Sequence, residues 1–443
     1  MPRLRRLAAA VLSLAGLGLG HAAGAGEEPD LARWRPAFAR PDAAPEPRAN
    51  PTTPEKAALG RALFHDERLS GDGRTSCATC HQPELSFSDG VARRAGHDGE
   101  PLPRRTPPLW NLAWGLTFFW DGRAPTLEAQ ASGPIENPRE MAGDLAAAAV
   151  RLRGDPGAIK AFEAAFPADP RISEAHVREA LAAYQRTLVS PRTRFDDWVA
   201  GNEEALSAGE RAGLALFVGK AGCVACHSGW RFTDEAFHDI GLPQATPDLG
   251  RGEALDLRPL DRAFKTPSLR ERVWTAPYMH DGSVPTLEAA VDHYADGIVP
   301  RPTLSPDLPR GLTLSPEERA QLVAFLATLS SEDPPRPAPL PTAAATAGTE
   351  PIVAGATRIG QSGRRFAPGA VRIHAGETLT FVNDDTRTHQ IRVDDPRMTY
   401  ASGAQEPGDT LPLTFAEPGA FEVTCGVHPE MHLSVEVEAP PRH

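Results

Sequence analysis

"DGRAPTLEA" at residues 121–129 and "DGSVPTLEA" at residues 281–289 spell almost the same nine residues twice in a chain of 443. So long an agreement is not expected by chance, and other agreements accompany it. "TPPL" at residues 106–109 and "TPSL" at residues 266–269 both begin 15 residues before the aspartate of the longer repeat. A repeat at matched spacing indicates two copies of one structural unit. The sequence therefore predicts an internal duplication.

Helical segments surround the repeat in both copies. A small apolar helix end comes first, "LGRALF" at residues 59–64 or "AGLALF" at residues 212–217. Each copy closes on "LAAYQRTL" at residues 181–188 or "LVAFLATL" at residues 322–329. Apolar residues in the closing segments recur at i, i+3 or i+4, and i+7, which is the spacing of one helix face. Both copies are therefore predicted to be mostly α-helical.

Each copy contains one CxxCH motif, and the two motifs together use four of the five cysteines. The residues are Cys77, Cys80 and His81 in "CATCH" and Cys223, Cys226 and His227 in "CVACH". CxxCH is the attachment motif of c-type haem, in which the two thiols bond to the porphyrin and the histidine binds the iron. A redox dithiol does not need the histidine, and a zinc site would need further ligands at a spacing that neither copy offers. The sequence predicts two covalently bound haem c groups with His81 and His227 as proximal ligands.

The composition changes after the second copy. Residues 331–350 are rich in proline and alanine, which predicts a semi-rigid linker without a core of its own. Beyond the linker the apolar period falls to two, in segments such as "ETLTFVN" and "HLSVEVE" that Gly, Pro, Asp and Asn separate. This pattern predicts a small all-β sandwich of about 90 residues.

A metal-ligand pattern lies in the β region. His389 follows "TFVNDDTRT", and Cys425, His428 and Met431 form a CxxHxxM motif. Two histidines, one cysteine and a weak axial methionine are the ligands of a type 1 blue-copper site, and the last three would share one loop after a strand. The neighbouring His432 is a rival to Met431, but it would point to the other face of the following strand. A buried free cysteine with surface histidines is the plainer alternative.

The first residues are typical of an export signal. A basic start, "MPRLRR", precedes an apolar run at residues 7–19 and the small residues Ala23, Gly24 and Ala25. The run is too short to span a bilayer easily, although an uncleaved anchor is the alternative. We therefore expect a signal peptide at residues 1–25, a periplasmic protein and no membrane span after cleavage. The net charge of −12 argues against nucleic acid as a partner.

Together these motifs resemble two known families. Residues 50–330 resemble the bacterial di-haem cytochrome c peroxidases and their MauG-type relatives, and residues 355–437 resemble cupredoxins of the amicyanin and plastocyanin kind. The fold expected is multidomain, with two duplicated cytochrome c-like helical domains before an all-β cupredoxin sandwich. The expected segments are a signal peptide at 1–25, a peroxidatic haem domain at 50–200, an electron-transfer haem domain at 205–330, a linker at 331–350 and a cupredoxin domain at 351–443.

The resemblance implies roles for residues around the first repeat. "FFWDGRAPTLEAQASGPIENPREM" at residues 118–141 carries the peroxidase landmarks. It implies that Trp120 lies between the haems and that Gln130 and Glu140 line the peroxide pocket of the first haem. His97 would close the distal side of that haem in the resting state. Cleavage of a peroxide O–O bond needs a group that moves a proton, and a carboxylate whose pKa burial raises can do so, so Glu140 is the candidate.

Two positions depart from the usual peroxidase pattern. Tyr294 stands where a methionine normally provides the sixth ligand of the second haem, as in MauG, and an anionic phenolate there would lower the potential. His293, Met279 and His280 are rivals for this position. Arg105 replaces an asparagine that helps to hold calcium, and a fixed cation disfavours a second one, so calcium is not expected in the usual manner.

Three functions are compatible with these sites. The first is a periplasmic peroxidase that reduces hydrogen peroxide to water with electrons relayed from the copper domain, which a small cytochrome c or cupredoxin would reduce. The second is a MauG-type oxidase that acts on a protein or organic substrate through high-valent iron, which Tyr294 favours and His97 disfavours. The third is a non-enzymatic carrier with three metal centres, which Gln130 and Glu140 disfavour. The oligomeric state, including a homodimer, is left open.

Overall fold

The computed structural model describes residues 30–244, 248–337, 353–362, 365–395, 397–428 and 431–439. The signal peptide expected at residues 1–25 lies outside the described residues, as does most of the linker expected at 331–350. Within the described part of the chain, no helix combines the length and the apolar character needed to cross a membrane.

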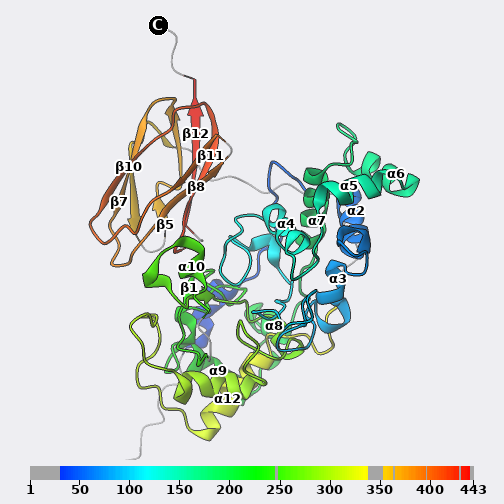
Figure 1. The fold of residues 1–443 in the computed structure, drawn as a ribbon. Coiled ribbons are helices and arrows are strands. Elements are labelled where there is room, and N and C mark those ends of the chain that lie inside the picture. Colours follow the sequence, from blue (N-terminus) through cyan, green and yellow to red (C-terminus); the bar gives the residue numbers. More distant parts are fainter. Residues whose placement is uncertain are drawn as a thin grey trace, which may run out of the picture. The chain divides into compact units, whose positions relative to one another are not determined.

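The region before the linker is helical, with irregular connections, several of them long (Figure 1). Its α-helices are α1 (Arg35–Phe38), α2 (Pro54–Phe64), α3 (Cys77–Cys80), α4 (Leu127–Glu136), α5 (Leu145–Arg153), α6 (Pro156–Ala165), α7 (Glu174–Arg186), α8 (Arg194–Val199), α9 (Ala208–Val218), α10 (Arg251–Leu255), α11 (Leu287–Asp292) and α12 (Pro316–Ala327). The strands β1 (Phe237–His238) and β2 (Phe264–Lys265) pair within it, and a π-helical turn, η9 (His293–Gly297), follows α11. We call α2 to α7 the first half and α9 to α12 the second half.

Short 3₁₀ helices occur throughout this helical region. They are η1 (Leu31–Trp34), η2 (Glu67–Leu69), η3 (Pro83–Leu85), η4 (Leu112–Trp114), η5 (Glu203–Ala205), η6 (Cys223–Ala225), η7 (Arg258–Leu260) and η8 (Arg272–Trp274). The turns η4 and η8 occupy matched positions, 160 residues apart. The spacing of the sequence repeat therefore continues into the local backbone.

Each half is built on one close crossing of two helices. Helix α2 packs on α7 in the first half, and α9 packs on α12 in the second. The repeated glycine of "LGRALF" and "AGLALF" lies at the crossing, where a Cβ added to Gly60 would overlap the carbonyl oxygen of Ala180 and one added to Gly213 would overlap that of Gln321. Glycine recurs here because only a residue without a side chain permits such close backbone approach.

The repeated nine residues form the same turn and helix start twice. Gly122 and Gly282 have φ angles of 65° and 68°, in the left-handed region that glycine adopts without strain. The side chains of Thr126 and Thr286 then cap α4 and α11, each accepting a backbone N–H three residues ahead at 3.1 Å. The sequence "DG…PTLEA" is thus a turn followed by an N-capped helix, and the predicted duplication is present in the structure.

The two halves exchange equivalent hydrogen bonds. The backbone N–H of Lys265 donates to the carbonyl of Trp120, and that of Arg105 donates to the carbonyl of His280, both at 2.8 Å. These are matched positions, so each half gives the other the same bond. The rings of Trp120 and His280 meet with centroids 6.5 Å apart. This reciprocal contact fixes the two halves to each other where the repeats face.

The region after the linker is a sandwich of two sheets, drawn in orange to red in Figure 1. One sheet has the order β10-β7-β4-β5 and the other β3-β6-β12-β11-β8-β9. The strands are β3 (Val353–Ala354), β4 (Arg358–Ser362), β5 (Arg365–Ala367), β6 (Ala370–His374), β7 (Thr378–Asn383), β8 (Ile391–Asp395), β9 (Met398–Ala401), β10 (Thr410–Thr414), β11 (Gly419–Cys425) and β12 (His432–Glu438). Inward residues of both sheets, such as Phe381 and Val435, share one core. The predicted all-β sandwich is confirmed.

Candidate haem and copper sites

The two CxxCH motifs orient their histidines in the same way. Nδ1 of His81 lies 3.1 Å from the carbonyl oxygen of Phe87, and Nδ1 of His227 lies 2.9 Å from that of Phe232. A carbonyl can only accept, so Nδ1 carries the proton and Nε2 is the basic nitrogen that can bind iron. Burial lowers the pKa of both histidines, which keeps each imidazole neutral.

The carbonyls that hold these histidines belong to a motif that the sequence interpretation overlooked. Phe87 and Phe232 both have left-handed backbones, with φ of 57° and 56°. Each begins a matched tripeptide, "FSD" at residues 87–89 and "FTD" at residues 232–234. The tripeptide begins six residues after His81 but five residues after His227, so a comparison of the two copies that allows a one-residue shift would have revealed it.

The second CxxCH motif borders a mostly apolar cavity. Cys223, Cys226 and His227 line it, together with the side chains of Phe217, Leu269, Leu287, Val291, Leu322 and Leu326. Burial raises the pKa of the Cys223 thiol, and also that of Cys77 in the first motif, to about 12. Thiols kept neutral in an apolar cavity beside a neutral imidazole fit a thioether-linked porphyrin better than a thiolate metal site.

Two expected pocket residues of the first haem come from one helix and the turn after it. Gln130 lies half-buried on α4, and Glu140 follows that helix. The side-chain amide of Asn137 donates to the Glu140 carboxylate at 2.7 Å. Burial raises the pKa of Glu140, although Asn137 and Arg123 oppose the shift. Burial, and more weakly the charges of Asp89 and Glu140, raise the pKa of the Cys80 thiol in the first CxxCH motif.

The backbone of His97 contacts the segment that carries Glu140, but its side chain lies at the surface. Its backbone N–H donates to the carbonyl of Arg139 at 2.7 Å. Its side chain is 39% exposed, and Nδ1 lies 3.7 Å from the carboxylate of Asp72. A distal-ligand role for His97 stays a prediction.

Trp120 lies where the two halves meet. Its side chain is buried and lines the cavity of the second CxxCH motif. Its indole N–H donates to the carbonyl of Arg105 at 3.0 Å. The Arg105 side chain is also buried, and its guanidinium donates to Ser88 Oγ at 2.9 Å and to the carbonyl of Thr275 at 2.5 Å. Burial lowers the pKa of Arg105 to about 10, so the group still carries its charge at neutral pH. The chain itself thus holds a cation between its two halves.

Tyr294, on the π-helical turn η9, lines the cavity of the second CxxCH motif. Burial raises the pKa of its phenol, and the thiols of Cys226 and Cys223 act in the same direction. These surroundings favour the neutral phenol, whereas the sequence interpretation considered a phenolate.

The rivals of Tyr294 have partners of their own. His293 Nε2 lies 3.0 Å from the carbonyl oxygen of Ile240, and His280 stacks on Phe264 with ring centroids 3.5 Å apart. Met279 and His280 both line the cavity. The choice of sixth ligand therefore stays open among residues that the fold does bring together.

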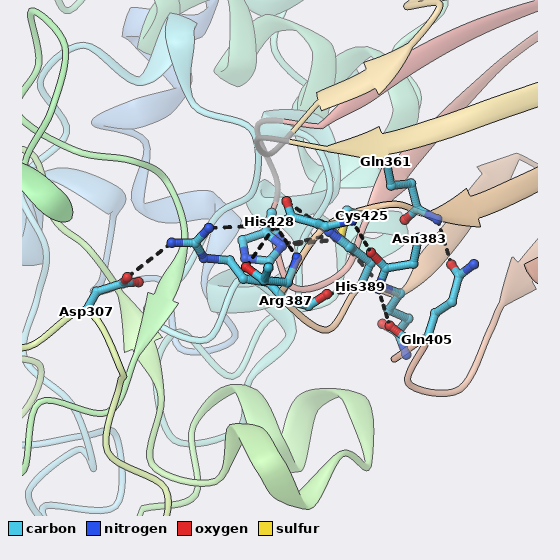
Figure 2. Close-up of polar contacts among 11 residues, drawn as sticks. Asp307, Gln361, Asn383, Arg387, His389, Gln405, Cys425 and His428 are labelled. Carbon is cyan, nitrogen blue, oxygen red and sulfur yellow. Dashed lines mark hydrogen bonds and ion pairs between the residues drawn. The ribbon is translucent and has the colours of Figure 1, made fainter. Parts of the chain in front are cut away.

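The ligands expected for copper gather at one end of the β sandwich (Figure 2). Cys425 ends β11, and His428 lies on the loop that follows. Cys425 Sγ lies 3.5 Å from Nδ1 of His389 and 3.9 Å from Nδ1 of His428, and the two histidine nitrogens are 3.2 Å apart. Three mutually close N, S and N donors, all buried, fit a trigonal copper site.

The sulfur and the axial position have defined surroundings. The backbone N–H groups of Gln390 and His428 approach Cys425 Sγ at 3.5 and 3.4 Å. Donors of this kind around a ligand sulfur tune the properties of a bound metal. Met431 is fully buried in the same core, whereas His432 has a 40% exposed side chain with Nδ1 4.0 Å from Glu422. The placement of both residues agrees with the choice of Met431.

Comparison with known proteins gives a consistent result. The family model described as di-haem cytochrome c peroxidase matches residues 54–204. The methylamine utilization protein MauG of Methylorubrum extorquens is 52% identical over 305 residues, which are 68% of this chain and 86% of that protein. The cytochrome-c peroxidase IdrP1 of Denitromonas iodatirespirans is 40% identical over 324 residues, covering 66% of this chain and 85% of that protein.

A solved structure gives the same result at the level of the fold. The crystal structure of a MauG-like protein associated with microbial copper homeostasis aligns with a TM-score of 0.61 at 33% identity, over 67% of this chain and 94% of that one. The relatives that this chain resembles are peroxidases and MauG proteins. The prediction of an oxidoreductase enzyme is thereby confirmed over that of a non-enzymatic carrier.

Proposed function

Because the chain belongs to the family of di-haem cytochrome c peroxidases and MauG proteins, we propose that it is an exported peroxidase that reduces hydrogen peroxide to water with electrons from its own cupredoxin domain. The observation that carries this proposal is the half-buried carboxyl group of Glu140, whose pKa burial raises and whose charge acts on the Cys80 thiol of the first CxxCH motif. A group of this kind can take the proton from the inner peroxide oxygen and return it to the outer one.

The cofactors supply the redox chemistry: when bound, two haem c groups and one type 1 copper carry single electrons, and an open haem iron reduces the peroxide. The residues of the chain hold and arrange these groups. His81 and His227 would bind the two irons, while His389, Cys425, His428 and Met431 would bind copper. Gln130 would help to orient peroxide, and His97 would cover the first site in the resting enzyme.

The path of the electrons follows from the contacts between the halves. Trp120 is buried at their junction and lines the cavity of the second CxxCH motif, which supports a role in coupling the second haem to the first. The donor that reduces copper would be a small cytochrome c or another cupredoxin, and export through residues 1–25 would put the enzyme in the periplasm. Calcium is not part of the proposal, because the Arg105 guanidinium supplies a fixed cation at the junction.

A second function has its own supporting observation. Tyr294 lines the cavity of the second CxxCH motif. A tyrosine at this position is expected of a MauG-type oxidase that acts on a protein or organic substrate. Electron paramagnetic resonance of the resting ferric protein separates the two functions. Two low-spin haems support the peroxidase, in which His97 closes the first iron, whereas a high-spin first haem supports the oxidase.

The test of the main proposal compares the wild type with Cys425→Ser, which removes the copper ligand sulfur but leaves both CxxCH motifs intact. Each fully haem-loaded protein is mixed with a reduced soluble donor and hydrogen peroxide, and turnover is followed by stopped flow. We expect the variant to lose donor-driven turnover while a chemical reductant that reaches the haems directly still supports it. Equal donor-driven turnover in both proteins would remove the copper domain from the pathway.

A further inference from the structure

One buried arginine outside every predicted site joins the copper-binding loop to the helical region. Arg251 begins α10, and it is only 1% exposed. Its Nε and Nη2 donate to the carbonyl oxygen of Gly426 at 3.0 and 2.5 Å. Its Nη1 donates to the carbonyl oxygens of Asp121 and Gly122 at 2.9 and 2.8 Å. One guanidinium therefore bridges three carbonyls from two distant parts of the chain.

The two ends of this bridge are next to residues with proposed roles. Gly426 directly follows Cys425, the residue that would bind copper through sulfur. Asp121 and Gly122 directly follow Trp120, the residue at the junction of the two halves. A path made only of covalent bonds and one guanidinium with its hydrogen bonds therefore leads from the copper ligand to the tryptophan.

Among the described residues no carboxylate pairs directly with Arg251, so its charge is held in another way. The carboxylate of Asp121 is bound by Arg104 and Arg123, so Arg251 uses the backbone carbonyl of that residue instead. Its guanidinium lies 4.3 Å from the centre of the Phe237 ring. Burial lowers the pKa of Arg251 to about 9, and the group is therefore still charged at neutral pH. Burying such a charge is costly unless its hydrogen bonds are satisfied, which the carbonyls achieve here.

Glycines make this close approach feasible at both ends. A Cβ added to Gly122 would overlap the ring of Phe237, and one added to Gly426 would overlap the side chain of Gln390. A side chain at either position would have to displace one of these neighbouring side chains.

We propose that Arg251 is a positioning residue for electron transfer, which holds the Cys425–Gly426 backbone against the Trp120–Gly122 segment. This inference rests on the proposed function. In the step concerned, one electron leaves cuprous copper, which becomes cupric, and reduces one ferric haem to ferrous, while Arg251 gains and loses no proton. Transfer slows steeply when bonded contact is replaced by a gap, so loss of the bridge slows this step.

A second contact between the same regions serves as the matched control. Nη2 of Arg387, two residues before His389, lies 3.3 Å from the carboxylate of Asp307 (Figure 2). The Arg387 side chain is 38% exposed, so the pair is screened by solvent. Arg387→Gln removes an arginine from this contact without touching the bridge to Trp120.

The experiment measures electron transfer within the full chain, loaded with both haems and copper. Copper is reduced by a short pulse, and the haem absorption is followed in the wild type, Arg251→Gln, Arg251→Lys and Arg387→Gln. We expect Arg251→Gln to slow transfer about tenfold or more, equivalent to about 1.4 kcal/mol of barrier. The transfer rate of Arg251→Lys should lie between those of the wild type and Arg251→Gln, because an ammonium cannot match the planar fork of a guanidinium. The rate of Arg387→Gln should be close to that of the wild type.

A second readout needs neither copper nor turnover. In the copper-free protein, hydrogen exchange of the backbone at residues 118–123 and 424–428 should quicken in Arg251→Gln and not in Arg387→Gln. Equal transfer rates in the wild type and Arg251→Gln, with the copper absorption intact, would overturn the role of Arg251 alone. If the wild type itself shows no transfer from copper to haem, the proposed function fails, and the role of Arg251 fails with it.

Discussion

Residues 111 and 271 occupy the same buried turn in the two haem-binding halves, yet the first is an asparagine and the second a glutamate. Both have a left-handed backbone, with φ of 62° and 61°, and neither is exposed. The backbone N–H of Asn111 donates to the carbonyl of Leu188, and that of Glu271 donates to the carbonyl of Leu329, so each ties its turn to the end of the closing helix. The duplication has kept the backbone and changed the charge.

The preceding position, Trp110 in the first half and Arg270 in the second, also changes from a neutral to a charged residue. Trp110 donates its indole N–H to Ser86 Oγ at 2.6 Å, whereas Arg270 forms a buried ion pair with Asp196 at 2.8 Å. At this pair of matched positions, only the second half carries a buried charge. The first half has the acid of Glu140 among the charges that act on its CxxCH motif. This difference suits a division in which the first half handles protons and peroxide and the second handles electrons.

Glu140→Gln should break that division with the largest effect. The amide keeps the size of the side chain and can still accept from Asn137, but it cannot take up a proton from peroxide. Loss of a general acid–base group costs about 10²–10⁴-fold in rate, and we expect peroxide turnover to fall in this range. Steady-state kinetics with hydrogen peroxide measure the change.

The control for this prediction is Glu136→Gln. Glu136 is an exposed residue at the end of the same helix α4, and its replacement should leave turnover close to that of the wild type. Equal losses in the two variants would show that the effect comes from the helix rather than from the acid at residue 140.

The helix crossings test whether the halves are equivalent as scaffolds. Gly60→Ala and Gly213→Ala each introduce a Cβ into the carbonyl of the facing helix. Overpacking of this kind costs about 1–3 kcal/mol of unfolding free energy, and both variants should lose a similar amount. Gly209→Ala, on the open face of α9, should instead gain about 0.4–1 kcal/mol. Denaturant unfolding measures the free energy of unfolding of the three variants. An unchanged free energy for Gly213→Ala would contradict the equivalence of the two halves.

The same equivalence explains how much of the molecule the sequence could predict. The duplicated helices, the haem motifs and the copper ligands depend on short local patterns, because caps, turns and metal ligands demand particular residues at fixed spacing. The bridge of Arg251 joins segments about 130 and 175 residues away, and nothing in the sequence around it indicates a partner. The surface position of His97 was likewise hidden, because its pairing with Asp72 depends on the fold.

Glu271→Gln gives the smallest effect, and it makes the second half resemble the first. Burial raises the pKa of Glu271, and the hydrogen bonds from Ser331 and the charges of Arg270 and Arg40 only partly oppose the shift. A carboxyl group whose pKa is higher in the folded than in the unfolded state costs stability once the pH exceeds its unfolded pKa, and the cost grows until the pH passes its folded pKa. The amide avoids this cost and can keep the bonds from Ser331.

We therefore expect Glu271→Gln to be more stable than the wild type at neutral pH, by an amount of the order of one hydrogen bond, about 1 kcal/mol. The gain should disappear below about pH 3, where the wild-type carboxyl is protonated in both states, and unfolding measured from about pH 3 to pH 8 follows it. The reciprocal variant, Asn111→Asp, should lose stability over the same range, because it puts an acid into the buried turn of the first half. A gain for Glu271→Gln that is independent of pH would show that packing, and not the buried charge, distinguishes the two turns.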